Sequence, residues 1–140
     1  MDIVKICTSG YQKDPEGKCE KVAHLAEGKY YLRNGKHYIK YDDSSMDTDY
    51  IIGTTIKIDG SKFRILRNGP IDTDMNFEAG KTTYAVYRTP YSSMKLEIYT
   101  RQLDISMDYA SGNVELYYDM RVDGTFVGEY ELRIEISKVV

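Results

Sequence analysis

The chain is 140 residues long, with 41% hydrophobic residues, 29% charged residues and a net charge of -3 at pH 7. This length fits one domain around one core, and the apolar content excludes an intrinsically disordered chain. The chain also lacks the clustered basic face of nucleic-acid-binding proteins, so we expect no nucleic-acid partner.

The first ten residues, MDIVKICTSG, contain neither the basic segment nor the continuous apolar segment of a secretory signal. No stretch approaches the roughly 20 apolar residues that a membrane-spanning helix needs. We therefore expect a cytoplasmic protein that does not enter a membrane. The two cysteines, Cys7 and Cys19, fit that reducing compartment.

Short runs of alternating apolar and polar residues follow one another along the whole chain, as in half-buried antiparallel strands. Turn sequences such as Asn34-Gly35, Asp59-Gly60 and Asp123-Gly124 separate these runs. Helix signals are nearly absent. We predict about ten strands, at residues 2–11, 19–32, 36–42, 50–58, 62–67, 72–78, 81–88, 93–109, 113–122 and 125–138.

The first two predicted strands form a hairpin around the turn Asp14-Pro15-Glu16-Gly17. This turn places Cys7 near His24 and Cys19 near Gln12, and at about 3.3 Å per residue the two thiols lie too far apart for a disulfide. A Cys7–His24 pair would suit a thiolate catalyst or half of a metal site. Because no C-x-x-C or H-E-x-x-H motif accompanies it, an interior histidine beside a structural thiol is the favoured interpretation.

The acidic segment at residues 42–49, DDSSMDTD, has no periodicity and is expected to form a loop. Its aspartates could suggest a calcium loop, but such a loop requires a glycine at its sixth position and a glutamate at its twelfth. Counting from Asp42, those positions hold Asp47 and Gly53. We therefore predict neither a metal ion nor another cofactor.

Two arginines, Arg67 and Arg88, lie at the ends of predicted strands. Together they could hold a carboxylate or a phosphate, although arginines at strand ends are also commonly solvated. Pro90 cannot donate to a sheet, so the Arg-Thr-Pro-Tyr corner around it is predicted to be a turn. Its position at the end of a strand makes Arg88, Thr89 and Tyr91 candidate ligand-binding residues.

Tyrosine is the most unusual component of the composition, with fourteen residues and no tryptophan. Tyr118 and Tyr130 fall on predicted inward faces. Their phenol rings could line a ligand cavity or could simply fill the interior. Filling is the favoured interpretation, because the tyrosines are spread over many strands without a focal charged partner.

The predicted strands follow one another through tight turns without crossover helices, which favours an antiparallel up-and-down meander. The alternation changes phase near Arg101-Gln102, and this predicts a β-bulge that bends the strand. Closing the meander removes the exposed edges of the sheet. We therefore expect a single all-β barrel of about ten strands.

A family resemblance rests on five segments in a fixed order, GTTIKI (53–58), ILRNG (65–69), MNFEAGK (75–81), YRTPY (87–91) and GEYELRIEI (128–136). With them the chain resembles the YwiB-like family of uncharacterised bacterial proteins over nearly its whole length. The resemblance implies a calycin-type (lipocalin-like) barrel with no established activity or catalytic residue. Ser92 stands where the family pattern would have glycine, and the absence of tryptophan rules out the Gly-x-Trp of lipocalins.

We expect this barrel to bind a small amphipathic or anionic ligand at its mouth without catalysis. An enzyme is disfavoured because the sequence contains no recognisable set of nucleophile and base. The alternative is a protein-interaction or structural module with a filled interior, whose partner is another protein or a second copy of the chain. The predicted ligand contacts are Arg67, Arg88, Thr89, Tyr91, Tyr118 and Tyr130.

Overall fold

A computed structural model describes residues 1–43 and 52–139 and contains ten antiparallel strands. The strands are β1 (Asp2–Lys13), β2 (Cys19–Arg33), β3 (Lys36–Asp43), β4 (Ile52–Asp59), β5 (Lys62–Asn68), β6 (Thr73–Glu78), β7 (Thr82–Arg88), β8 (Ser93–Asp108), β9 (Ser111–Val122) and β10 (Thr125–Lys138). The predicted all-β class is confirmed. Among these residues no helix is long and apolar enough to cross a membrane.

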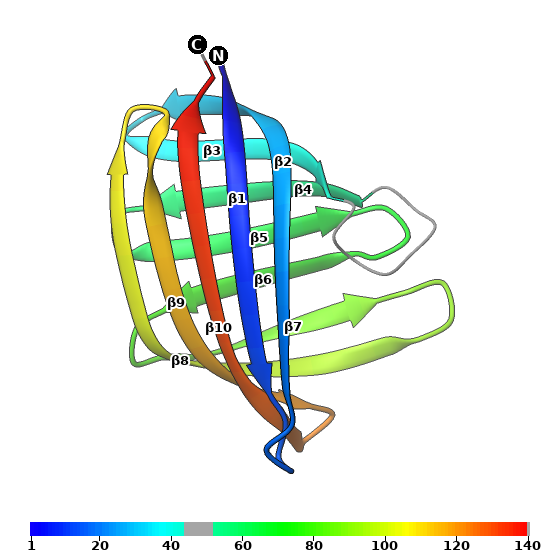
Figure 1. Ribbon diagram of the computed structural model, residues 1–140. Helices are drawn as coiled ribbons and strands as arrows, with labels where there is room; N and C mark the ends of the chain where they lie inside the picture. Colours follow the sequence, from blue (N-terminus) through cyan, green and yellow to red (C-terminus); the bar gives the residue numbers. More distant parts are fainter. Residues whose placement is uncertain (44–51, 140) are drawn as a thin grey trace.

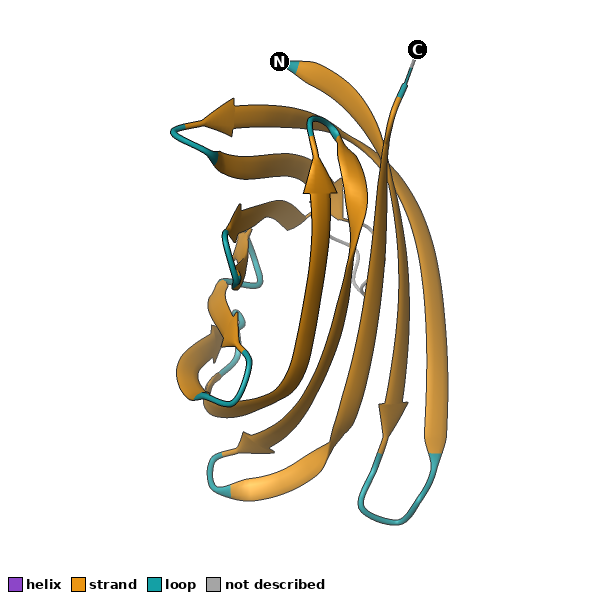
Figure 2. Ribbon diagram, turned by 90° about the vertical axis from the view of Figure 1, so that its left-hand side faces the viewer, coloured by secondary structure: helices purple, strands orange, loops and turns teal. Residues whose placement is uncertain are grey.

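The strands form one sheet in the order β6-β5-β4-β3-β2-β1-β10-β9-β8-β7. In Figure 1 the long strands β1, β2, β9 and β10 run across the short strands β3 to β6, and Figure 2 shows the two groups facing each other. The outer strands β6 and β7 meet through a backbone bridge between Asp72 and Arg88. The hydroxyl of Thr83 also donates to the carbonyl of Asn76. The sheet is therefore a nearly closed up-and-down barrel, as predicted.

Two β-bulges bend the long strands. The register of β8 against β9 shifts between Thr100 and Gln102, which confirms the bulge predicted from the sequence. A second shift, between Phe126 and Gly128 in β10, was not predicted. It turns Phe126 to the outer face, where the guanidinium of Arg121 lies 5.9 Å from its ring centroid.

The register of the first hairpin differs from the prediction by one residue. Cys7 pairs with Leu25, and His24 pairs with Thr8. The turn uses one residue more than expected, because the Asp14 N–H donates to the carbonyl of Lys18 at 2.9 Å. A shift of one residue moves a side chain to the opposite face of a strand. The predicted Cys7–His24 pair is therefore wrong, whereas both cysteines are free, as expected.

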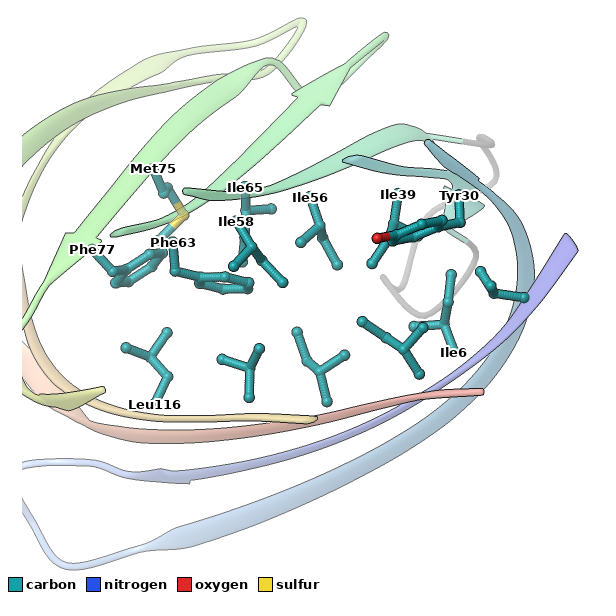
Figure 3. Close-up of a cluster of buried hydrophobic side chains, with 14 of the residues drawn as sticks. Ile6, Tyr30, Ile39, Ile56, Ile58, Phe63, Ile65, Met75, Phe77 and Leu116 are labelled. Atoms are coloured by element: carbon teal, nitrogen blue, oxygen red, sulfur yellow. The ribbon is translucent and has the colours of Figure 1, made fainter. Parts of the chain in front are cut away.

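The apolar core lies between the two groups of strands and fills one part of the barrel. One of its rows crosses four neighbouring strands, with each residue opposite the next in register: Ile39, Ile56, Ile65 and Met75. These side chains point towards the long strands, from which Ile6 and Leu116 approach (Figure 3). This part of the interior is packed with side chains, so a site has to lie elsewhere.

Candidate functional site

A row of polar side chains crosses the inner face of the barrel next to this apolar row. Tyr41 pairs with Thr54, Thr54 with Arg67, and Arg67 with Thr73. Tyr87 extends the row onto β7, because it precedes the residue that bridges β6 and β7. Each of the first four residues is two positions from a residue of the apolar row, so it faces the same interior. We call these five residues the polar belt.

Arg67 is the charged centre of the polar belt. Its Nε atom is buried and has no hydrogen-bond partner in the described part of the chain. One terminal nitrogen, Nη1, lies 3.8 Å from the sulfur of Met75, which is a weak acceptor. None of the ion pairs formed among the described residues includes Arg67. A guanidinium keeps its charge in a protein, so a partly buried one without a counter-ion is suited to hold an anion.

Three phenols from separate strands lie within the electrostatic reach of this charge. Burial raises the pKa of Tyr41 to about 12, Asp43 adds to the rise, and the charge of Arg67 opposes it. Burial likewise raises the pKa of Tyr118 and of Tyr87, again with Arg67 opposing. The three hydroxyls therefore stay protonated at neutral pH and can each donate a hydrogen bond.

Tyr118 and Tyr130 form an aromatic wall on the long strands. Their rings are stacked, with centroids 5.0 Å apart and an angle of 8° between planes. The ring of Phe77 also contacts Tyr118, with the two ring centroids 5.0 Å apart. The cross-strand neighbour of Tyr118 is Thr100, whose buried hydroxyl has no hydrogen-bond partner among the described residues. Both tyrosines point inward, as the sequence predicted.

The Arg-Thr-Pro-Tyr corner lies outside the interior. Arg88 is on the outer face of β7 and exposed, so it does not converge with Arg67 on one ligand. The Thr89 hydroxyl oxygen accepts the N–H of Ser92 at 3.1 Å and that of Tyr91 at 3.3 Å, which confirms the predicted turn. Tyr91 is 94% exposed. These corner residues are therefore at the rim of the barrel, while Arg67 and the aromatic wall are inside.

His24 points into the barrel from β2, where its Nε2 lies 3.9 Å from Oδ1 of the buried Asp43. Its register neighbour Thr8 donates a hydrogen bond to its carbonyl at 3.4 Å. A histidine and a carboxylate are two parts of a nucleophilic triad, but the thiol proposed as the third part, Cys7, is on the outer face. Cys7 therefore does not complete a triad with His24 and Asp43.

No group of three residues suited to bind a metal ion occurs in residues 1–43 and 52–139. The calcium interpretation of the acidic segment concerned Asp42, Asp43, Asp47 and Asp49, and the last two lie outside the described residues.

Sequence reasoning named Arg67, Tyr118 and Tyr130 as candidates, but it did not name the other members of the polar belt: Tyr41, Thr54, Thr73 and Tyr87. Their alternation was visible in the sequence, since Tyr41 has the parity of Ile39. What was lacking was the register that places them in one row with Arg67.

Comparison with known proteins supports the fold and defines the family. A model of the family described as a domain of unknown function (DUF1934) matches residues 4–134. A relative from Bacillus subtilis (strain 168), the uncharacterized beta-barrel protein YwiB, is 23% identical over 112 residues, which cover 78% of this chain and 75% of the relative. The crystal structure of the B. subtilis YwiB protein superposes with a TM-score of 0.88 at 20% identity, over 99% of this chain and 93% of that one. The chain therefore belongs to the DUF1934 family of β-barrel proteins.

Proposed function

We propose that the protein binds a small amphipathic anion just inside the mouth of the barrel, with Arg67 as the residue that holds the charge. The single observation that carries this proposal is the buried Nε of Arg67, which has no hydrogen-bond partner in the described chain. Leaving such a donor unsatisfied destabilises the protein, and an anion that accepts from it would remove that cost.

The chemistry of the polar belt fits a carboxylate or phosphate group. A guanidinium presents parallel N–H groups that match two oxygens of such a group. The protonated hydroxyls of Tyr41, Tyr87 and Tyr118 supply further donors near the same charge. Because the polar belt lies inside the barrel, where the effective dielectric constant is lower than in water, each of these hydrogen bonds is stronger than it would be in water.

The proposed activity is binding without catalysis in the cytoplasm. The belt can orient and neutralise an anion, but its hydroxyls come from threonine and from tyrosines with raised pKa, which are poor nucleophiles. The free cysteines fit a reducing compartment. We expect neither a nucleic acid nor a membrane as the partner of this site.

The test is an NMR titration of the protein with acetate and with inorganic phosphate. We expect saturable shifts in the wild type, affinity weakened at least about tenfold in Arg67→Gln, and a smaller loss in Arg67→Lys, which keeps the charge but not the paired N–H groups. Arg88→Gln is the matched control, because Arg88 is exposed on the outer face, and it should bind like the wild type. Equal binding by Arg67→Gln and the wild type would refute the proposal.

A second candidate function is association with a protein partner through β2. Val22 and Leu25 are 55% and 60% exposed, and in the described register only Lys29–Arg33 of β2 pairs with β3. Exposed apolar residues on a strand edge favour pairing with another chain. If this is the function, replacing both residues with serine should abolish a complex that is seen by native mass spectrometry of protein from its own cell. An unchanged complex would exclude β2 as the contact.

A further inference from the structure

Gly10 occupies the inner face of β1 without a backbone reason for being glycine. It pairs with Val22 on β2 and with Leu132 on β10. A glycine within a strand weakens it and usually marks a special conformation or a close approach. Gly10 has neither, because it is absent from the residues with positive φ. A Cβ added to it would meet only the carbonyl oxygen of Val22, at 4.0 Å.

The missing side chain leaves a hollow on the inner wall of the barrel. The hollow has a volume of about 130 Å³, and Gly10, Val22, Tyr118, Tyr130 and Leu132 line its apolar part. An enclosed apolar cavity on the order of 150 Å³ binds a benzene molecule, and this hollow, although open to solvent, has a comparable volume. The size therefore suits a single six-membered ring, and the stacked rings of Tyr118 and Tyr130 offer an aromatic surface for it.

The charges around the hollow determine how a ligand would be oriented. Glu20, which has the inward parity of Val22, also lines it, so an anionic group is disfavoured there. Tyr118 joins the two places, because it lines the hollow and its ring also contacts Phe77. Phe77 is two positions along β6 from Met75, whose sulfur lies 3.8 Å from Nη1 of Arg67. An uncharged ring would occupy the hollow, and the acid group would point to the polar belt.

We infer that the ligand is a small monoanionic acid carrying one ring, with the ring in the Gly10 hollow against Tyr118 and Tyr130 and the acid group on Arg67. This inference rests on the proposed function, because it adds a second contact to the anion site at Arg67. It explains why a strand of the barrel retains a glycine that its backbone does not require.

The experiment measures dissociation constants for benzoate, phenylacetate and 3-phenylpropionate. Acetate probes the anion site at Arg67 alone, and benzyl alcohol probes the Gly10 hollow alone. We expect at least one ring acid to bind the wild type about tenfold or more tightly than acetate does, from burial of the ring. Gly10→Val fills the hollow and should remove that gain while leaving acetate binding unchanged. Val22→Phe fills the same hollow from β2 and serves if the first variant does not fold.

Gly53→Val is the matched control, since Gly53 is also within a strand, has no positive φ and has space for a Cβ, 3.7 Å from the carbonyl oxygen of Asn68. It should bind every probe like the wild type. The inference would be overturned if the ring acids bound no more tightly than acetate, or if their tighter binding persisted in both Gly10→Val and Val22→Phe. Either result would leave the Arg67 site intact. If no acid binds in a way that depends on Arg67, the proposed function fails and the inference with it.

Discussion

Replacing Arg67 with methionine should make the ligand-free protein more stable. The Nε atom of Arg67 is buried without a partner among the described residues, and Nη1 meets only the sulfur of Met75. An unsatisfied buried donor costs about 1–3 kcal/mol, and more when it is charged. Methionine is unbranched and flexible, so it can occupy the path of the arginine stem beside Met75. Because Arg67 keeps some exposure, we expect the free energy of unfolding to rise by about 1–2 kcal/mol, the lower part of this range.

The gain should appear in urea unfolding followed by circular dichroism, in a buffer free of carboxylates and phosphate. For a domain of this size, 1 kcal/mol corresponds to about 2–5 °C in Tm. The control is Arg88→Met, which changes an exposed arginine on the outer face and should stay within about 0.5 kcal/mol of the wild type.

Saturating ligand should then reverse the order, because an anion that binds only the folded wild type stabilises it by mass action. Such a ligand should not stabilise Arg67→Met. Arg67→Met could instead be less stable than the wild type by about 1 kcal/mol or more in the absence of anions, which is the usual cost of lost packing. Arg67 would then support the fold, and the reasoning behind the site would be refuted.

Three further predictions concern the fold. The pKa of Tyr41 is higher in the folded state than in the unfolded chain, so the stability that this difference contributes should be fully present below about pH 10. It should be lost as the pH rises towards 12, and Tyr41→Phe should reduce this loss, measured as urea midpoints. Gly112→Ala should cost about 2 kcal/mol or more, since its φ is 149° and a Cβ would lie 2.2 Å from a carbonyl oxygen; Gly53→Ala should be near neutral in the same assay. Asp74 accepts two hydrogen bonds from Arg64, at 2.8 and 2.6 Å, which lower its pKa from 3.8. Asp74→Asn should therefore cost about 0.2–1 kcal/mol at neutral pH and nothing at about pH 2, and an equal cost at both would contradict the pairing.

The strands could be predicted from the sequence because each depends on local alternation and on its own turn. The bulge near Arg101 was visible as a change of phase. The bulge in β10 was not, because Phe126 and Val127 are both apolar and an extra residue between apolar neighbours changes no pattern. The register of the first hairpin was missed for a similar reason, since Lys18 joins the turn through a backbone hydrogen bond that leaves no mark in the composition.

The site was harder to predict than the strands. Arg67 could be identified because it continues the inward parity of Ile65 at the end of β5. Its surroundings depend on which residues of β3, β6 and β7 arrive beside it, and that is decided by the packing of distant segments. Arg88 was wrongly grouped with Arg67 because both end a strand, although their side chains are on opposite faces.

The pairing of β1 with β10 has a consequence for how the protein is made. These strands lie side by side from Val4–Lys138 to Lys13–Glu129, although they come from opposite ends of the chain. During translation β1 emerges long before β10, so one of its edges stays without this neighbour until β10 has been synthesised. Pairings between distant segments form slowly, and unprotected edges recruit other chains. A ribosome that stalls before β10 should thus release an aggregation-prone nascent chain. We therefore expect chaperones to protect the free edge of β1 until β10 pairs with it.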